Sequence, residues 1–184
     1  MKTNKIFLSC LVLVFFALFP SSSFAASNEA GSAGTLASFA PLLVDKRVSH
    51  LQAFLQTYNS PLASHAVTFI READKHNMDW RFVAAISGVE STFGKHIPPG
   101  SYNAWGWGIP TGAQSGIGFD NWDDGIATVT KGLKKNYINK GAVSFQQIGS
   151  IYAASPFWAS HVEYFMDKIT NFVPSDKDLL EITI

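Results

Sequence analysis

The chain has 184 residues, with 14 lysines and arginines against 14 aspartates and glutamates, and 14 % of its residues are aromatic. This balanced charge argues against a nucleic-acid partner, because nucleic-acid-binding domains normally present a basic face. The single cysteine, Cys10, excludes a disulfide within the chain.

Residues 1–25 have the pattern of a secretory signal peptide. Lys2 and Lys5 precede an almost wholly apolar run, residues 6–19, and small residues follow at Ser23 and Ala25. We expect cleavage after Ala25, which places the mature chain beyond the inner membrane, in the periplasm, cell wall or medium. The apolar run is short for a transmembrane anchor, so we expect no membrane insertion of the mature chain.

Residues 26–35, ASNEAGSAGT, are small and polar and are typical of a flexible leader. No internal repeat or second linker interrupts the sequence that follows. We therefore expect a single domain over residues 36–174, a short tail over residues 175–184, and a monomer.

Helical periodicity dominates the first half of this domain. We expect a helix over residues 36–58, and a second one that opens at Ser60-Pro61 and ends near Asn77. Asp79 is the expected N-cap of a third helix over residues 80–93, which Gly94 ends.

Glycines and prolines recur from residue 95 to 119, KHIPPGSYNAWGWGIPTGAQSGIGF, and forbid a regular helix there. A binding loop is the simplest interpretation, with a short β-hairpin possible. Helical patterns return at Asn121, at the capping box formed by Ser144 and Gln147, and after Ser155-Pro156. The sequence thus predicts a mainly α domain with one irregular, aromatic-rich insert.

Glu90 is the strongest candidate for chemistry. It falls on the helical stripe of Val83, Ile86 and Phe93, where an apolar residue would be expected. Desolvation there would raise its pKa and keep it protonated near neutral pH, as a general acid requires. Most glutamates on helices reach water or pair with a lysine, but Glu90 lies just before Gly94 and the aromatic loop.

That loop and the helix after it supply flat aromatic surfaces beside polar groups. Pyranose rings stack their C–H faces on indoles, while their hydroxyl groups need amide and backbone partners. Trp105 or Trp107 alone would more often be a core residue, but together they favour a glycan-binding groove. The candidate substrate-binding residues are Ser91, Tyr102, Asn103, Trp105, Trp107 and Trp122.

Other chemistries find little support in the sequence. The five histidines lack metal-ligand spacing such as H-E-x-x-H, so we expect no metal, and we expect no cofactor. No cysteine nucleophile or G-x-S-x-G motif is present in the domain. Asp120, Asp123 and Asp124 could include a second catalytic acid, but at a helix start they favour capping and compensation of the helix dipole.

The segment VESTFGKHIPPGSYNAWGWGI resembles the catalytic segment of the bacterial glucosaminidase family of peptidoglycan hydrolases, within the lysozyme-like group. The matching positions are Glu90-Ser91, Gly94-Lys95 and the run 103–107. Residues 119–122 resemble a Phe-x-x-Tyr element with Trp122 in place of tyrosine. Residues 151–162 resemble a Tyr-Ala-Thr-Asp-Pro segment in which alanine and serine replace threonine and aspartate.

This resemblance implies a lysozyme-like helical domain that cleaves β-1,4 glycosidic bonds of murein glycan strands, as an endo-β-N-acetylglucosaminidase. It also implies that Glu90 is the general acid and that Tyr152 lies near the cleaved bond. Two alternatives stay open: a lytic transglycosylase that forms anhydro-muramic ends, and a non-catalytic module that binds cell-wall glycan.

Overall fold

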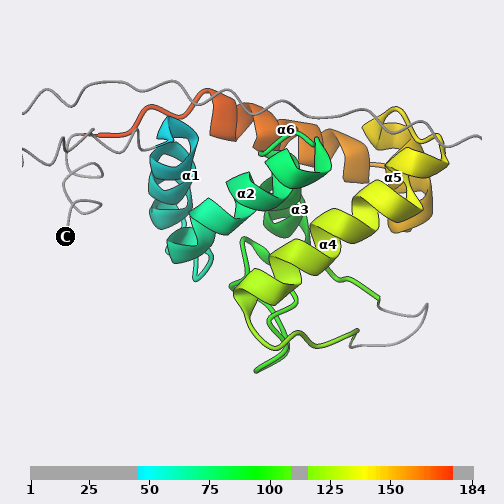
Figure 1. Cartoon of the computed structure of the whole chain (residues 1–184), viewed down its shortest axis with the longest axis horizontal. Helices are drawn as coiled ribbons and strands as arrows, with labels where there is room; N and C mark the ends of the chain where they lie inside the picture. The colour runs from blue at the N-terminus through cyan, green and yellow to red at the C-terminus, as the bar shows by residue number, and fades with distance from the viewer. Residues whose placement is uncertain (1–44, 109–115, 176–184) are drawn as a thin grey trace, which may run out of the picture. The chain divides into compact units, whose positions relative to one another are not determined.

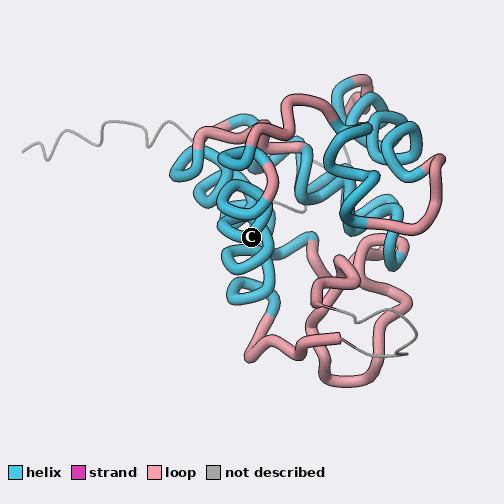
Figure 2. The backbone as a smooth tube through the Cα atoms, turned by 90° about the vertical axis from the view of Figure 1, so that its right-hand side faces the viewer, coloured by secondary structure: helices cyan, strands magenta, loops and turns pink. Residues whose placement is uncertain are grey.

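The computed structural model describes residues 45–108 and 116–175, and within these ranges the protein is helical, with no strand (Figure 1, Figure 2). The predicted signal peptide, leader and most of the tail lie outside the described residues. The elements are α1 (Lys46–Thr57), the 3₁₀ helix η1 (Ala63–His65), α2 (Ala66–His76), α3 (Phe82–Ser91), α4 (Trp122–Asn136), the 3₁₀ helix η2 (Ile138–Lys140), α5 (Phe145–Tyr152) and α6 (Trp158–Thr170).

Helix α3 is the centre of the packing. Every residue from Phe82 to Gly88 is buried, as expected of a helix that is apolar on all sides. α3 packs against α6, and α2 packs against α4 and α1. The largest side chains with almost no exposed surface come from all of these helices and from the loop after α3: Leu51, Leu55, Phe69, Ile86, Phe93, Trp105, Ile126, Leu133 and Ile169.

The predicted starts of the first two helices need correction. α1 begins at Lys46, because Asp45 has extended backbone angles and its Oδ1 accepts the N–H of Arg47 at 2.9 Å. The part of the predicted helix before Asp45 lies outside the described residues. Ser60 does not cap α2: its Oγ accepts the N–H of Leu62 at 3.0 Å and so caps the turn before η1. α2 itself begins only at Ala66.

Helix α3 is shorter at both ends than the predicted span of 80–93. Asp79 caps the turn before it, since its Oδ1 accepts the N–H of Arg81 at 2.9 Å. The helix ends at Ser91, because Thr92 and Phe93 both have left-handed backbone angles, with φ of 52° and 58°. This conformation is strained for a β-branched residue, and it turns the Phe93 ring into the core.

The later helices confirm their predicted caps. Asn121 Oδ1 accepts the N–H of Asp124 at 2.9 Å at the start of α4. Ser144 Oγ accepts the N–H of Gln147 at 3.2 Å, while Gln147 Oε1 accepts the N–H of Val143 at 2.7 Å, as in a capping box.

Among residues 45–108 and 116–175, every helix is too short or too polar to cross a bilayer.

The insert lies as an irregular loop at one end of the helices (Figure 2). Two backbone hydrogen bonds join its described limbs, from Ile117 N–H to Trp107 O at 3.3 Å and from Phe119 N–H to Ser101 O at 2.9 Å. The limbs are paired, yet residues 95–108 and 116–119 form no strand. Residues 109–115 of the predicted hairpin lie outside the described residues.

Gly125→Ala tests how closely this loop packs on α4. A Cβ at position 125 would lie 2.8 Å from Trp105 Cζ3 and 3.0 Å from the backbone oxygen of Tyr102. Overpacking costs about 1–3 kcal/mol, more than the roughly 1 kcal/mol by which a helix favours alanine over glycine. We expect urea unfolding to show a lower free energy of unfolding.

Gly118→Ala is the control, because its nearest neighbour is the backbone oxygen of Ser101 at an unstrained 3.8 Å. It should change the free energy of unfolding by less than about 0.5 kcal/mol. Equal stability of the two variants would contradict the close contact between the loop and α4.

Candidate active site around Glu90

Glu90 lies in the last turn of α3, where the helix reaches the surface. Its residue surface is exposed, whereas Val83, Ile86 and Phe93 are buried. The prediction that Glu90 faces inward with these three residues is therefore wrong. α3 is buried along its length, and only its final turn comes out of the core, so a carboxylate can be placed there.

The Glu90 carboxylate is nevertheless held by the protein. Trp158 Nε1, from the first turn of α6, donates a hydrogen bond to Glu90 Oε1 at 2.7 Å. Burial of the carboxyl group raises the pKa of Glu90, and the Trp158 N–H opposes this effect because it stabilises the charged form. The direction agrees with the desolvation expected from the sequence, although solvent still reaches the residue.

No second carboxylate of the described residues contributes to the pKa of Glu90. The carboxylate of Asp123, a residue of α4, instead contacts α2 and η1. Its Oδ1 accepts the hydroxyl of Thr68 at 2.6 Å and lies 2.9 Å from His65 Nδ1. The Thr68 hydroxyl lowers the pKa of Asp123. Asp124 Oδ2 accepts the N–H of Asp120 at 3.3 Å. These contacts favour the capping role expected at the start of α4.

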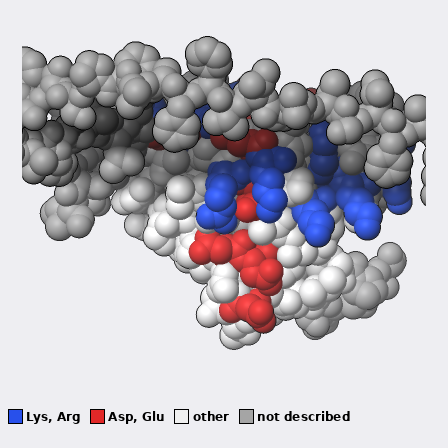
Figure 3. All heavy atoms as spheres, in the orientation of Figure 1, with Lys and Arg blue, Asp and Glu red and all other residues white. Residues whose placement is uncertain are grey.

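Figure 3 shows one face of the molecule, on which lysine and arginine side chains gather above a group of acidic side chains, while other acidic groups lie among the basic ones. Within residues 45–108 and 116–175, no group of three or more His, Cys, Asp or Glu side chains could hold a metal ion.

Tyr152, at the end of α5, links Trp158 to the loop. Its hydroxyl donates to the backbone oxygen of Trp105 at 2.5 Å, and its ring stacks on that of Trp158, with centroids 4.9 Å apart and planes at 29°. Burial, with a further contribution from the charge of Glu90, raises the pKa of Tyr152 well above its ordinary value. Tyr152 is therefore neutral at neutral pH, and the charge of Glu90 contributes to its raised pKa.

Tyr152 also lines a cavity of about 330 Å³. Trp107 forms part of its wall, and the Trp107 ring lies 6.0 Å from that of Tyr152 and 6.4 Å from that of Tyr137. The cavity is lined by Gly106, Trp107, Gly108, Tyr137, Ile151 and Tyr152. Of the predicted aromatic residues, Trp107 is thus the one that lines a cavity together with Tyr152.

Trp105 does not form part of this surface. Its ring has no exposed area, and its Nε1 donates to the backbone oxygen of Val83 at 2.9 Å. The prediction that Trp105 stacks on a sugar is therefore wrong. A single Trp-Gly-Trp run cannot reveal which indole faces the core, because the strained backbone of the loop decides that.

The polar side-chain groups of Asn103 and Ser91 form hydrogen bonds with backbone groups of the loop itself. Asn103 Nδ2 donates to the backbone oxygens of Trp107 and Ile117, both at 2.9 Å, and its Oδ1 accepts the N–H of Trp107 at 3.0 Å. Ser91 Oγ donates to the backbone oxygen of Ala104 at 2.8 Å. In this structure both residues shape the loop rather than present free groups to a substrate.

Tyr102 and Trp122 form a second aromatic pair. Their rings meet edge to face with centroids 5.3 Å apart, and both are partly exposed. Trp122 lies against Gly94, where a Cβ would come within 3.1 Å of the indole. The six predicted binding residues therefore divide into an outer pair, a buried set, and Trp107 beside Tyr152.

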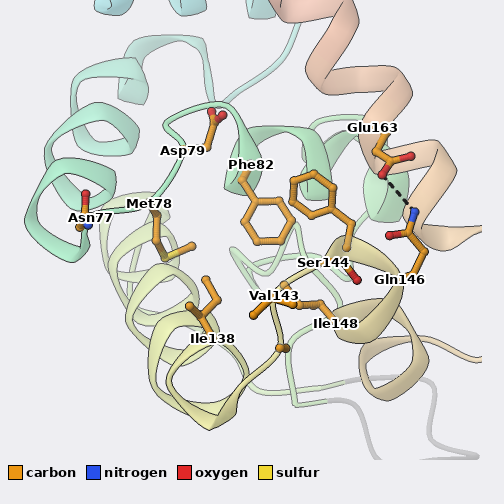
Figure 4. Close-up of a pocket in the computed structure, with 12 residues that line it drawn as sticks. Asn77, Met78, Asp79, Phe82, Ile138, Val143, Ser144, Gln146, Ile148 and Glu163 are labelled. Carbon is orange, nitrogen blue, oxygen red and sulfur yellow. Dashed lines mark hydrogen bonds between the residues drawn. The ribbon is translucent and has the colours of Figure 1, made fainter.

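A larger cavity than that beside Tyr152 lies elsewhere (Figure 4). It has about 510 Å³ and a mainly apolar wall that includes Met78, Phe82 and Ile148. Its carboxylate Glu163 accepts a hydrogen bond from Gln146 Nε2 at 3.1 Å. No residue of the Glu90 site lines this cavity, so we do not assign the chemistry to it.

Trp158 is the site residue that the sequence interpretation missed. Its position on the apolar stripe of the last helix predicted a core role, and it is only 2 % exposed. The signal that could have found it is its place six residues after Tyr152 and directly after the Ser155-Pro156 turn.

Comparison with known proteins finds similarity to two proteins of Streptococcus pneumoniae. Both, from strains TIGR4 and R6, are named "Putative endo-beta-N-acetylglucosaminidase" and are 31 % identical to this chain over 126 residues, or 64 % of its length. The aligned part spans only 19 % and 18 % of those proteins. No family model matches the chain. The similarity points, in coarse terms, to a glycan hydrolase.

Glu90→Gln should stabilise the fold at neutral pH. Because burial raises the pKa of Glu90 in the folded state, that state binds the proton more tightly and loses stability as the pH rises from the ordinary value of 4.5 through the raised value. Glutamine carries no such penalty. Thermal unfolding from about pH 4 to about pH 8 should show a gain that shrinks in acid. A gain independent of pH would contradict the burial of the carboxylate.

Asn103→Ala should destabilise the protein, because buried backbone groups of the loop lose their partners. Each unsatisfied group costs about 1–3 kcal/mol, so the midpoint of urea unfolding should fall clearly. Asn139→Ala, at an exposed position in η2, is the matched control and should behave as the wild type. An unchanged midpoint for Asn103→Ala would refute its role in holding the loop.

Proposed function

We propose that this protein is a glycoside hydrolase that cleaves β-1,4 bonds of peptidoglycan glycan strands, as an endo-β-N-acetylglucosaminidase within a lysozyme-like domain. The observation that carries the proposal is a solvent-accessible Glu90 whose pKa is raised by burial and which accepts a hydrogen bond from Trp158; Trp158 in turn stacks on Tyr152, which lines an aromatic cavity. The names of the two pneumococcal relatives support the same class of reaction.

Glu90 acts as the general acid. Its raised pKa keeps a proton on the carboxyl group at a higher pH than an exposed glutamate would, and the accessible oxygen donates that proton to the glycosidic oxygen. Positive charge then develops on the sugar ring as the bond breaks. The hydrogen bond from Trp158 stabilises the carboxylate that is left behind.

For the second half of the reaction, no other carboxylate of the described residues contributes to the pKa of Glu90. A retaining glycosidase places its two carboxyl groups about 5–5.5 Å apart and an inverting one about 6.5–9.5 Å apart. Asp123 accepts the hydroxyl of Thr68, Asp124 Oδ2 accepts the backbone N–H of Asp120, and none of these aspartates contributes to the raised pKa of Glu90. We therefore assign the stabilisation of the cation to the N-acetyl group of the substrate, with water completing hydrolysis.

The cavity between Trp107 and Tyr152 is suited to a sugar ring. Its aromatic walls offer apolar faces to pyranose C–H groups, and Gly106 and Gly108 let backbone groups approach the ligand closely. Tyr152 lines this cavity and stacks on Trp158, which donates to Glu90, so we propose that a glycan bound in the cavity extends toward the acid.

The same lack of a second carboxylate also suits a lytic transglycosylase, in which the 6-hydroxyl of muramic acid attacks the cation. Glu90 would then accept the proton of that hydroxyl as a base. Mass spectrometry of digested murein distinguishes the two reactions, because anhydro-muramic ends are lighter by one water than reducing ends. We expect new reducing N-acetylglucosamine ends.

The partner and location follow from this function. The substrate is the murein glycan, the mature chain acts outside the inner membrane as a monomer, and no nucleic acid takes part. The predicted signal peptide over residues 1–25 supports this location.

Glu90→Gln should lower murein cleavage by about 10²–10⁴-fold, because general acid catalysis contributes a factor of that size. Binding to insoluble murein should persist, since glutamine keeps the shape of the side chain. Release of soluble fragments and a pull-down with murein sacculi measure the two effects.

Glu163→Gln is the matched control, because it makes the same change on a helix at the unrelated cavity. It should cleave murein as the wild type does. If the wild type bound murein without releasing fragments, the alternative of a non-catalytic cell-wall-binding module would replace the hydrolase.

A further inference from the structure

The indole ring of Trp158 is tightly packed on one face and along one edge. One face stacks on Tyr152, and its edge lies on α5 at Gly149, where a Cβ would come within 2.9 Å of Trp158 Cε3. The residue is 2 % exposed and belongs to the first turn of α6. The ring can hardly rotate, so the direction of its N–H bond is set by the packing of α5 against α6.

This fixed N–H bond meets one oxygen of Glu90, and the chemistry of the two groups then decides where a proton can sit. Indole Nε1 is a donor only, so the oxygen that it contacts has to accept. In a protonated carboxyl group, the carbonyl oxygen accepts and the hydroxyl oxygen donates. Because the carbonyl oxygen is the better acceptor, the contact with Trp158 Nε1 at 2.7 Å favours Oε1 as the carbonyl oxygen and the proton on Oε2.

We propose that Trp158 is the positioning residue of Glu90: its indole N–H fixes Oε1 as the acceptor and leaves Oε2 to hold and deliver the proton. The delivery rests on the proposed function, whereas the coupling between Trp158 and Glu90 does not. The same N–H also remains as a partner for the carboxylate after the proton has left, so Glu90 keeps one orientation in both protonation states.

The charged and titratable groups around this pair are few among the described residues. Tyr152 of α5 faces Glu90 and stays neutral, because burial raises its pKa well above the ordinary value, and Tyr137 lies behind it. His161 and Glu163 follow Trp158 on α6. A titration seen at Trp158 is therefore assigned to Glu90 only if it disappears when Glu90 is replaced.

The first test does not require enzyme activity. The five tryptophans give five indole N–H signals in a ¹⁵N-labelled protein. The Trp158 signal should shift with pH in step with the carboxyl ¹³C signal of Glu90. In Glu90→Gln the signal should persist without that shift, because glutamine still accepts the hydrogen bond but does not ionise. A Trp158 signal that ignores pH in the wild type would overturn the proposal.

The second test removes the donor. Trp158→Phe keeps an aromatic ring next to Tyr152 but loses the N–H, so the Glu90 pKa should rise further and the alkaline limb of the pH profile for murein cleavage should move upward. Because Glu90 also loses its orientation, kcat should fall roughly ten- to a hundredfold. A purely structural role would lower activity equally at every pH.

Trp80→Phe is the matched control, since this indole packs edge to face on His50, away from the Glu90 site. It should leave the cleavage profile and the Glu90 titration unchanged. An unshifted Glu90 titration in Trp158→Phe would overturn the positioning role. If the wild type does not cleave murein but the Trp158 and Glu90 signals titrate together, the proposed function is wrong. The coupling between Trp158 and Glu90 is then still supported.

Discussion

The candidate site depends on the packing of α3 against α6. The hydrogen bond from Trp158 to Glu90 joins α6 to the last turn of α3. α3 is buried along almost its whole length, so it holds one rigid position in the core. Its last turn alone reaches the solvent. A carboxylate placed there is fixed by the core on one side and open to a substrate on the other. Contact with the core on one side raises the pKa of Glu90, while its other side stays accessible to solvent.

The loop after α3 depends on a small set of buried polar contacts. Ser91 ties it to the helix end, Asn103 folds it on itself, and the Tyr152 hydroxyl anchors it at Trp105. Thr92 and Phe93 adopt left-handed angles directly after the Glu90 turn. Strained backbone of this kind persists only where the surroundings enforce it, and it is common next to functional groups. Here the strain lets the chain leave α3 sharply enough to bring the loop beside Glu90.

The similarity to two named glucosaminidases and the local geometry support one class of reaction from independent directions. The aligned part of the chain covers less than a fifth of either relative, so their full activities do not transfer to it. What the geometry adds is specific: one carboxyl group with a raised pKa, one indole donor and a neutral tyrosine. No other carboxylate of the described residues contributes to the pKa of Glu90.

Local patterns in the sequence determined the helical class and the caps at Asn121 and Ser144, because each depends on neighbours within about one helical turn. The sequence did not reveal that Trp105 is buried while Trp107 lines a cavity, since both stand in the same glycine-rich run. It also assigned Trp158 to the core and missed its N–H. Those outcomes depend on how α5 and α6 pack against α3 and on the left-handed turn at Thr92 and Phe93. Contacts between residues 68 positions apart are decided by the packing of whole helices, which no local pattern records.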